Sequence, residues 1–508
     1  MVDGAVGEMN SSNSTSESKA KAATNTQTHG REEKEEESGR LDSLLKWAAG
    51  LGVSDSQKPD SCCCLGYSLA VSYFPDAGGR GMAAVRDLRK GELVLKVPKS
   101  ALITTQLLSR DDTLSAALKA HPSLSAAQVL IVCFLYELSK GRASPWHPYF
   151  LCLPRSYDIL AAFGEFEMQA LQVDYAIWAA QKAVTKAEYE WKEATVLMKE
   201  LKLKPQLLTL RAWIWATGTI CSRTMHIPWD EAGCLCPVGD LFNYAAPGED
   251  PNGFENADNL QNGDIIDVVD TQHSQRLTDG AFEERASAYC FYARKNYKKR
   301  EQVLLGYGTY TNLELLEHYG FLLDDNPNEK VFIPLEHDIH SSSSWPEDLL
   351  FIDQNGRPSF ALLSTLRLWA TPPHQRKSIG HLAYSGSQLS QGNELFVMKW
   401  LAKKCHVILK HMPTLIEEDK LLLSFIDKIQ DFDNLWEWGK ALPAFGNEFC
   451  DFLKATGMRI DDEFKSSGRR TQMMIDRWKL AVQWRLNYKN IILNCISYCT
   501  GIISSLSG

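Results

Sequence analysis

Three places in this chain combine residue types that could bind and act on a small ligand. The run GGRG contains Gly78, Gly79 and Arg80. Glycines in such a run suggest a tight turn where the backbone approaches a ligand closely. Tyr307 stands between two glycines, which would let a strand backbone come near ligands in a way that a plain core strand does not need. Arg223 lies between these places and offers a cation. The simpler interpretations are a half-buried aromatic for Tyr307 and a surface salt bridge for Arg223, and we favour function for both.

The glycine run also matches G-x-G-x-x-A, a pattern of dinucleotide-binding folds. That pattern requires a helix directly after the glycines and an acidic residue about 20 positions later. The sequence instead reaches the turn DLRKG within a few residues and reads VPKSALI where the acid should stand. We therefore exclude a dinucleotide fold. The sequence also lacks a P-loop, an H-E-x-x-H motif and a G-x-S-x-G motif.

Four segments, in order along the chain, resemble the SET-domain protein methyltransferases, and most closely the branch typified by the Rubisco large-subunit methyltransferase. They begin GGRGMAAV, SPWHPYFL, CSRTMHIP and LLGYGTYT and cover residues 78–104, 144–158, 221–248 and 304–326. Each is weak alone, but the four in order, with a helical insert before the third, form a specific pattern. Two C-terminal stretches, 393–423 and 481–493, resemble the helical substrate-binding domain of that branch. The resemblance covers roughly residues 40–500.

The resemblance implies S-adenosyl-L-methionine as the cofactor, held by the glycine run, by Arg223 and by a D-x-x-N-H motif. That motif maps to Asp240, Asn243 and Tyr244, so this sequence has a tyrosine where the family usually has a histidine. The change is tolerable if the residue serves through its backbone amide, and it lowers cofactor affinity if the imidazole itself matters. The residues expected to contact the cofactor are Gly78, Gly79, Arg80, Arg223, Asp240, Asn243, Tyr244 and Tyr319.

Tyr307 matches the catalytic tyrosine of the family, which would orient the target amine and stabilise the transferring methyl group through its hydroxyl. Met225 stands where the family contacts the target side chain, and an apolar residue suits a lysine stem better than an imidazole. The residues expected to contact the substrate are Met225, Tyr289, Tyr319 and Phe321. We predict methylation of lysine on a non-histone protein. The alternatives are a protein-histidine methyltransferase and a catalytically weak SET-fold scaffold that only binds proteins.

The predicted fold class is α+β, with SET-domain β-sheets, a pseudoknot and a helical insert, followed by an all-helical C-terminal domain. The sequence is β-like at 67–74 and 82–86, and LVLKVP at 93–98 alternates as a half-buried strand should. The range 248–284 reads as a long polar loop. Within the helical range 165–200, Trp178, Tyr189 and Trp191 are candidates for the core.

The expected domains are a disordered acidic and polar tail, a SET domain and a helical substrate-binding domain like that of the Rubisco enzyme. They cover residues 1–40, 41–335 and 336–508, and the helical insert spans about 107–215.

Composition limits the partners. The net charge of −9 argues against a sequence-independent grip on nucleic acid, and no segment approaches the 20 or so apolar residues that span a bilayer. We expect a protein substrate and a monomer, without nucleic-acid or membrane partners. The 13 cysteines are scattered and odd in number, which indicates reduced thiols, and the lone C-x-C of Cys234 and Cys236 has no second pair for a metal. The expected location is cytoplasmic and/or nuclear. The N-terminus, rich in Ser, Thr and Ala, leaves a plastid as the alternative.

Overall fold

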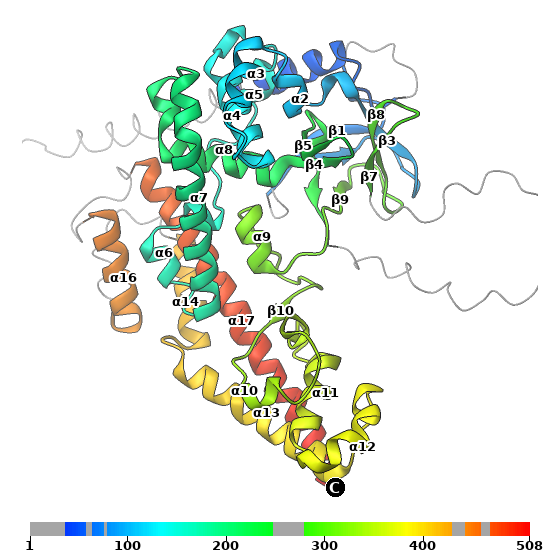
Figure 1. Ribbon diagram of the computed structural model, residues 1–508, viewed down its shortest axis with the longest axis vertical. Helices are drawn as coiled ribbons and strands as arrows, with labels where there is room; N and C mark the ends of the chain where they lie inside the picture. The colour runs from blue at the N-terminus through cyan, green and yellow to red at the C-terminus, as the bar shows by residue number, and fades with distance from the viewer. Residues whose placement is uncertain are drawn as a thin grey trace, which may run out of the picture.

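The computed structural model describes residues 36–56, 63–75, 79–246, 279–428, 442–458 and 468–507. Short strands and the helices around them gather at the upper end of an elongated molecule, and a long helix, α17 (Arg469–Ser507), runs from there to the lower end (Figure 1). The small sheets and many helices agree with the predicted α+β class.

A four-stranded sheet brings distant segments together in the order β1-β2-β9-β6. Its strands are β1 (Leu69–Phe74), β2 (Gly79–Ala84), β9 (Gln302–Leu305) and β6 (Asn243–Tyr244). β6 pairs parallel to β9, with Asn243 opposite Leu304 and Tyr244 opposite Leu305. This pairing sets the D-x-x-N segment directly beside the strand that leads to Tyr307, as the predicted pseudoknot requires.

Two further sheets complete the upper end. One has the order β3-β8-β7 and the other is the hairpin β4-β5. The strands are β3 (Leu93–Pro98), β8 (Ala288–Tyr292), β7 (Gly280–Glu283), β4 (Thr224–Ile227) and β5 (Asp230–Leu235). A small pair, β10 (Lys330–Val331) and β11 (Ile352–Asp353), lies lower in the molecule.

Helices occupy most of residues 105–223 and of the second half of the chain. The first group is α2 (Thr105–Leu108), α3 (Asp112–Lys119), α4 (Ala126–Ser139), α5 (His147–Phe150), α6 (Glu165–Gln169), α7 (Asp174–Glu200) and α8 (Leu210–Arg223). The second group is α9 (Asn312–His318), α10 (His337–His340), α11 (Phe360–Trp369), α12 (Pro373–Tyr384), α13 (Gln391–His411), α14 (Ile416–Lys428), α16 (Leu442–Thr456) and α17. α4 begins with a capping box between Ser125 and Gln128, which satisfies its first free amides.

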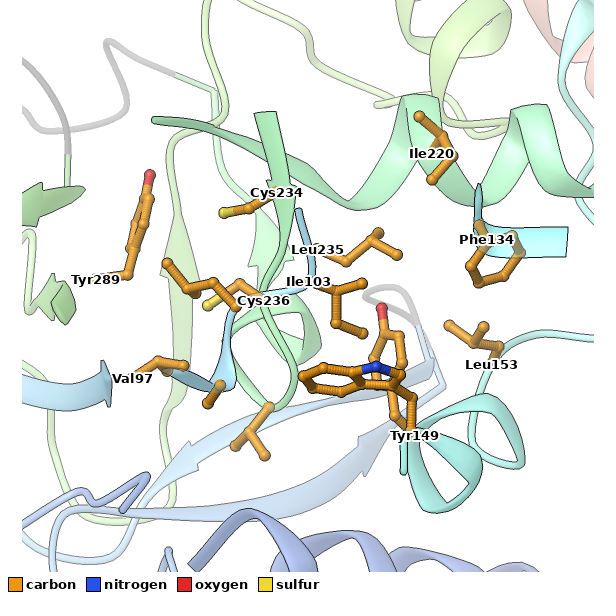
Figure 2. Close-up of a cluster of buried hydrophobic side chains, with 14 of the residues drawn as sticks. Val97, Ile103, Phe134, Tyr149, Leu153, Ile220, Cys234, Leu235, Cys236 and Tyr289 are labelled. Atoms are coloured by element: carbon orange, nitrogen blue, oxygen red, sulfur yellow. The ribbon is translucent and has the colours of Figure 1, made fainter. Parts of the chain in front are cut away.

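The first hydrophobic core lies among the sheets and α4 and α8. Figure 2 shows Leu235 of β5 pointing toward Ile103, while Cys234 and Cys236 point the other way, toward Tyr289. Cys234 and Cys236 therefore lie on one face of the extended chain at the end of β5, and Leu235 lies on the other. Both faces are buried, so the C-x-C spacing reflects the side-chain alternation of a buried strand.

The second core joins the helices α6 and α7 to α13, α14 and α17. α7 buries Ala176, Ala180, Ala183 and Ala187 there, and these small residues share one helical face. Arg485, a buried residue of α17, contacts Asp419 at 2.8 Å and Glu448 at 2.9 Å. Both carboxylates compensate the buried guanidinium, which would otherwise be costly.

Three predictions about elements were wrong. Residues 36–40, assigned to the tail, are helical and continue into a helix that reaches residue 50. Trp178 and Tyr189 are not in the core, because their side chains are 61% and 62% exposed on the outer face of α7. The loop predicted over 248–284 ends in a strand, since Gly280–Glu283 forms β7, while residues 248–278 lie outside the described ranges.

Among the described residues, α17 alone is long and apolar enough to cross a membrane by length and composition. Its buried side chains include Ile491, Ile492 and Cys495, which pack in the second core. The core helix of a globular domain has the same length and composition.

Candidate active site

Two cavities share a wall formed by Arg223 and Asp240. The first, here called the arginine cavity, has a volume of about 510 Å³. Its lining includes Arg40, Arg80, Arg155, Arg223, Asp240 and Asn243. The second, here called the tyrosine cavity, has a volume of about 570 Å³. Its lining includes Arg223, Met225, Asp240, Phe282, Tyr289, Tyr307, Tyr310 and Tyr319.

Arg223 is the last residue of α8, and a short turn carries Asp240 to meet it. The Nη1 atom of Arg223 donates to the Asp240 carboxylate at 2.8 Å and to the Asp240 carbonyl at 3.1 Å. The Asp240 side chain is 2% exposed. Burial opposes the charge of Arg223, but Asp240, Tyr157 and Tyr149 together outweigh it and raise the pKa of the guanidinium. Arg223 is thus a compensated cation on the wall between the cavities.

Two tyrosines from one stretch of chain support this ion pair. The Tyr149 hydroxyl donates to the Asp240 carboxylate at 2.8 Å, and the Nε of Arg223 donates to the Tyr157 oxygen at 3.2 Å. Burial and the Asp240 charge raise the pKa of Tyr149 well above its usual value, so it remains a hydrogen-bond donor. Neither tyrosine was predicted from the sequence to belong to the site.

The glycine run forms the start of β2 and borders the arginine cavity. Gly79 has a φ of +76°, a backbone conformation that residues other than glycine rarely adopt. Arg80 donates to the Cys152 carbonyl at 2.7 Å and lies 3.7 Å from Glu37. A Cβ added at Gly81 would lie 2.6 Å from the Asn243 side-chain nitrogen. Gly81 therefore leaves the space that Asn243 occupies. Gly78 lies outside the described residues.

Tyr307 follows β9 and projects among other aromatic rings. Its ring stacks on Tyr319 with centroids 5.4 Å apart and lies 5.3 Å from Tyr244. Its hydroxyl donates to the Phe242 carbonyl in a short hydrogen bond. Burial raises the pKa of the Tyr307 hydroxyl. The hydroxyl therefore stays protonated at neutral pH and is not a base.

The remaining predicted residues divide into two groups. Met225, Tyr289 and Tyr319 line the tyrosine cavity. Tyr244 and Phe321 are not among the residues that line either cavity. The Tyr244 ring packs against Tyr307, and the Phe321 ring packs against Tyr319. The Tyr244 hydroxyl donates to the Gly308 carbonyl at 2.8 Å, so its side chain supports the irregular segment that follows β9 and carries Tyr307. A cofactor contact through its backbone stays a prediction.

The helix over residues 36–50 adds three cavity residues from the range that was predicted to be a disordered tail. Glu36, Glu37 and Arg40 line the arginine cavity beside Arg80. Their only signal in the sequence is an i, i+4 pair, because Arg40 contacts Glu36 at 2.7 Å. Within the described ranges, no group of three or more His, Cys, Asp or Glu side chains could hold a metal ion.

Comparison with known proteins gives the family. A model for the Rubisco LSMT substrate-binding domain matches residues 295–492. Protein SET DOMAIN GROUP 40 of Arabidopsis thaliana is 54% identical over 482 residues, which are 92% of this chain and 97% of that protein. Actin-histidine N-methyltransferases of Mus musculus and Homo sapiens are 25% and 26% identical, over 75% of this chain and 62% of theirs.

Solved structures share the fold. The SET domain of LSMT bound to lysine and AdoHcy superposes with a TM-score of 0.54 and 19% identity, covering 92% of both chains. Rubisco LSMT bound to AdoMet gives a TM-score of 0.52 and 18% identity, covering 92% of this chain and 93% of the other.

The chain belongs to the SET-domain protein family, since more than half of its residues match a member along nearly the whole length. The resemblance inferred from four motifs and the predicted α+β fold are confirmed.

Proposed function

We propose that this protein transfers a methyl group from S-adenosyl-L-methionine to a lysine of a non-histone protein. The observation that carries the proposal is the pair of cavities that meet at Arg223 and Asp240. A polar, arginine-lined cavity beside an aromatic one suits two ligands that must approach each other end to end.

The arginine cavity fits the cofactor in size and in chemistry. Ligand sites of small molecules span about 300–1,000 Å³, and this cavity lies in that range at about 510 Å³. The cofactor carries a carboxylate, an amine and a sulfonium. Arg80 supplies a cation on the wall, Asp240 an anion, and Asn243 a side-chain amide. Solved relatives of the same fold are described as bound to AdoMet and AdoHcy. When bound, this cofactor supplies a methyl group on a positively charged sulfur.

The tyrosine cavity can prepare a lysine amine. The reference pKa of lysine is about 10.4, and the nucleophile must be neutral. Burial between the rings of Tyr289, Tyr307 and Tyr319 disfavours the ammonium and lowers its pKa. Tyr307 keeps its own proton, so its part is to orient the amine through its oxygen. Alignment of this kind supplies on the order of 7–11 kcal/mol in well-oriented reactions.

The hydroxyls of this cavity favour a target with several N–H groups. Three of them already donate to backbone carbonyls and retain only lone pairs as acceptors: Ser222 to Gly218, Thr224 to Ile220 and Tyr307 to Phe242. A lysine amine offers more than one N–H to such acceptors. A reactive imidazole offers one, because its attacking nitrogen carries no hydrogen. The apolar Met225 in the wall agrees with an aliphatic stem.

Histidine is the second candidate target, because actin-histidine N-methyltransferases align over 75% of this chain at about a quarter identity. The helical region that matches the substrate-binding model is the proposed recruiter of the protein substrate. We expect no nucleic-acid or membrane partner.

The test is transfer of labelled methyl from S-adenosyl-L-methionine to proteins of a cell extract, followed by acid hydrolysis and amino-acid analysis. Label in methyllysine, absent with Tyr307→Phe, supports the proposal. Label only in methylhistidine would move the target to histidine. No label from the wild-type protein, together with no heat on titration with the cofactor, would leave a protein-binding scaffold.

A further inference from the structure

The segment over residues 154–159, here called the connecting segment, joins three parts of the molecule. It follows α5 and runs past the end of α8. The indole nitrogen of Trp215, in α8, donates to the Pro154 carbonyl at 2.9 Å and fixes the start of the segment. The middle of the segment, Tyr157 and Asp158, makes the contacts that matter for the site.

Tyr157 reaches the wall between the two cavities. The Nε of Arg223 donates to its oxygen at 3.2 Å. The Tyr157 side chain packs against α8 at Gly218, where an added Cβ would lie 2.8 Å from its Cγ atom. Glycine inside a helix costs about 1 kcal/mol relative to alanine, so a packing reason is expected, and the Tyr157 ring supplies it. Asp240 holds one side of the Arg223 guanidinium, and Tyr157 holds the other.

Asp158 ties the same segment to α17, far away in sequence. The Nε of Arg477 donates to the Asp158 carboxylate at 3.0 Å, and Nη1 donates to the Ala162 carbonyl at 2.7 Å. Both side chains are largely buried, at 11% exposure for Arg477 and 26% for Asp158. Loss of one partner would leave a largely buried charge without compensation, which destabilises the position of the segment.

The backbone of Asp158 packs against Gly320, next to the tyrosine cavity. A Cβ added at Gly320 would lie 2.9 Å from the Asp158 carbonyl carbon, and Gly320 has a φ of +76°. Its chain neighbour, Tyr319, lines the tyrosine cavity and stacks on Tyr307. The connecting segment therefore packs directly between the two cavities and the long C-terminal helix.

We propose that Tyr157 is a positioning residue for Arg223, and that Arg477 of α17 holds Tyr157 in place through Asp158. The helical region that we propose to recruit the substrate would then help set the geometry of the cofactor cavity. This inference rests on the proposed use of S-adenosyl-L-methionine. Tyr157 acts on the cofactor only through Arg223, and Arg477 acts only through the connecting segment.

The test measures the dissociation constant of S-adenosylhomocysteine by calorimetry on the full chain. Arg477→Gln and Tyr157→Phe are each expected to weaken binding by about fivefold or more, as is usual for coupled sites. The double variant is expected to bind no more weakly than Arg477→Gln alone, because both changes break the same connection. Lys479→Gln is the matched control. It removes another ion pair of α17, with Asp427 at 2.5 Å, and should leave binding unchanged.

The melting temperature, measured on the same samples, separates positioning from loss of fold. If Arg477→Gln does not fold, Asp158→Asn takes its place, since it keeps the size of the side chain and removes its charge. Unchanged binding in the folded variants would overturn the inference, and so would strictly additive losses in the double variant. A wild-type protein that does not bind S-adenosylhomocysteine at all would instead refute the proposed function.

Discussion

The space at Gly81 yields a sharp prediction about the cofactor cavity. A Cβ at this position would lie 2.6 Å from the Asn243 nitrogen and 2.9 Å from the Gln302 nitrogen. Both atoms are the ends of flexible side chains. Gly81→Ala is therefore expected to fold, with Asn243 turned away from its present position.

The size of the effect follows from the contacts that Asn243 would lose. A gap of 2.6 Å is 0.8 Å short of the 3.4 Å at which ordinary contact begins, so the amide must rotate away. Loss of one hydrogen bond to a ligand costs about 0.5–1.5 kcal/mol, which weakens binding by roughly two- to tenfold. The backbone φ at Gly81 lies outside the positive range, so the change adds no backbone strain.

The assay is a calorimetric titration of S-adenosylhomocysteine into wild type, Gly81→Ala, Asn243→Ala and the double variant, with melting temperatures of all four. If the methyl group acts by displacing Asn243, the double variant will bind no more weakly than Asn243→Ala. Gly50→Ala is the control, because nothing lies within 4 Å of its Cβ position. Wild-type affinity in a folded Gly81→Ala protein would refute the reasoning.

Three further predictions concern catalysis and stability. Tyr307→Phe should lower kcat by about 10²–10³ while cofactor affinity stays within twofold, and an unchanged kcat would remove Tyr307 from catalysis. Burial raises the pKa of Glu329 from 4.5 to about 7, so the native carboxyl keeps a proton that the unfolded chain releases. Wild-type stability should therefore fall as pH rises from 4.5 to 7, by about 2–3 kcal/mol relative to Glu329→Gln in urea unfolding. A parallel pH profile of the two proteins would contradict this. Glu394→Gln breaks the buried pair with Arg367, at 2.8 Å, and should cost about 3 kcal/mol of unfolding free energy. Glu336→Gln breaks a surface ion pair with Lys404 and should cost about 0.5 kcal/mol of unfolding free energy at most. Equal losses in the two variants would refute the distinction between buried and surface pairs.

The sequence predicted the fold where its motifs and periodicity were strong. The strand that contains LVLKVP appears at the expected place, and α6 and α7 occupy most of the predicted helical range 165–200. The pairing of β6 with β9 had no local signal, because β6 is only two residues long. A pseudoknot was expected only because the whole set of motifs resembles the family.

The errors have physical causes. In α7 we expected large aromatic residues to be buried, whereas the helix buries its alanines and leaves Trp178 and Tyr189 outside. The alanines recur with helical spacing, so that period was available in the sequence, but size was given more weight than spacing. A close approach of α7 to its neighbours requires small side chains at the contact.

Tyr149 and Tyr157 were missed because their roles depend on tertiary contacts. Tyr149 bonds to Asp240, and Tyr157 bonds to Arg223, both from segments distant in sequence. One clue was present, namely Gly218 inside an otherwise regular helix, which indicates that another group lies close to that helix. The sequence does not say which group that is.

A crystal structure of the protein with S-adenosylhomocysteine tests the central claim most directly. We predict that the ligand lies in the arginine cavity, in contact with Arg80 and Asn243, with its sulfur directed past Arg223 toward Tyr307. Ligand bound elsewhere, or no ligand at saturating concentration, would contradict the account.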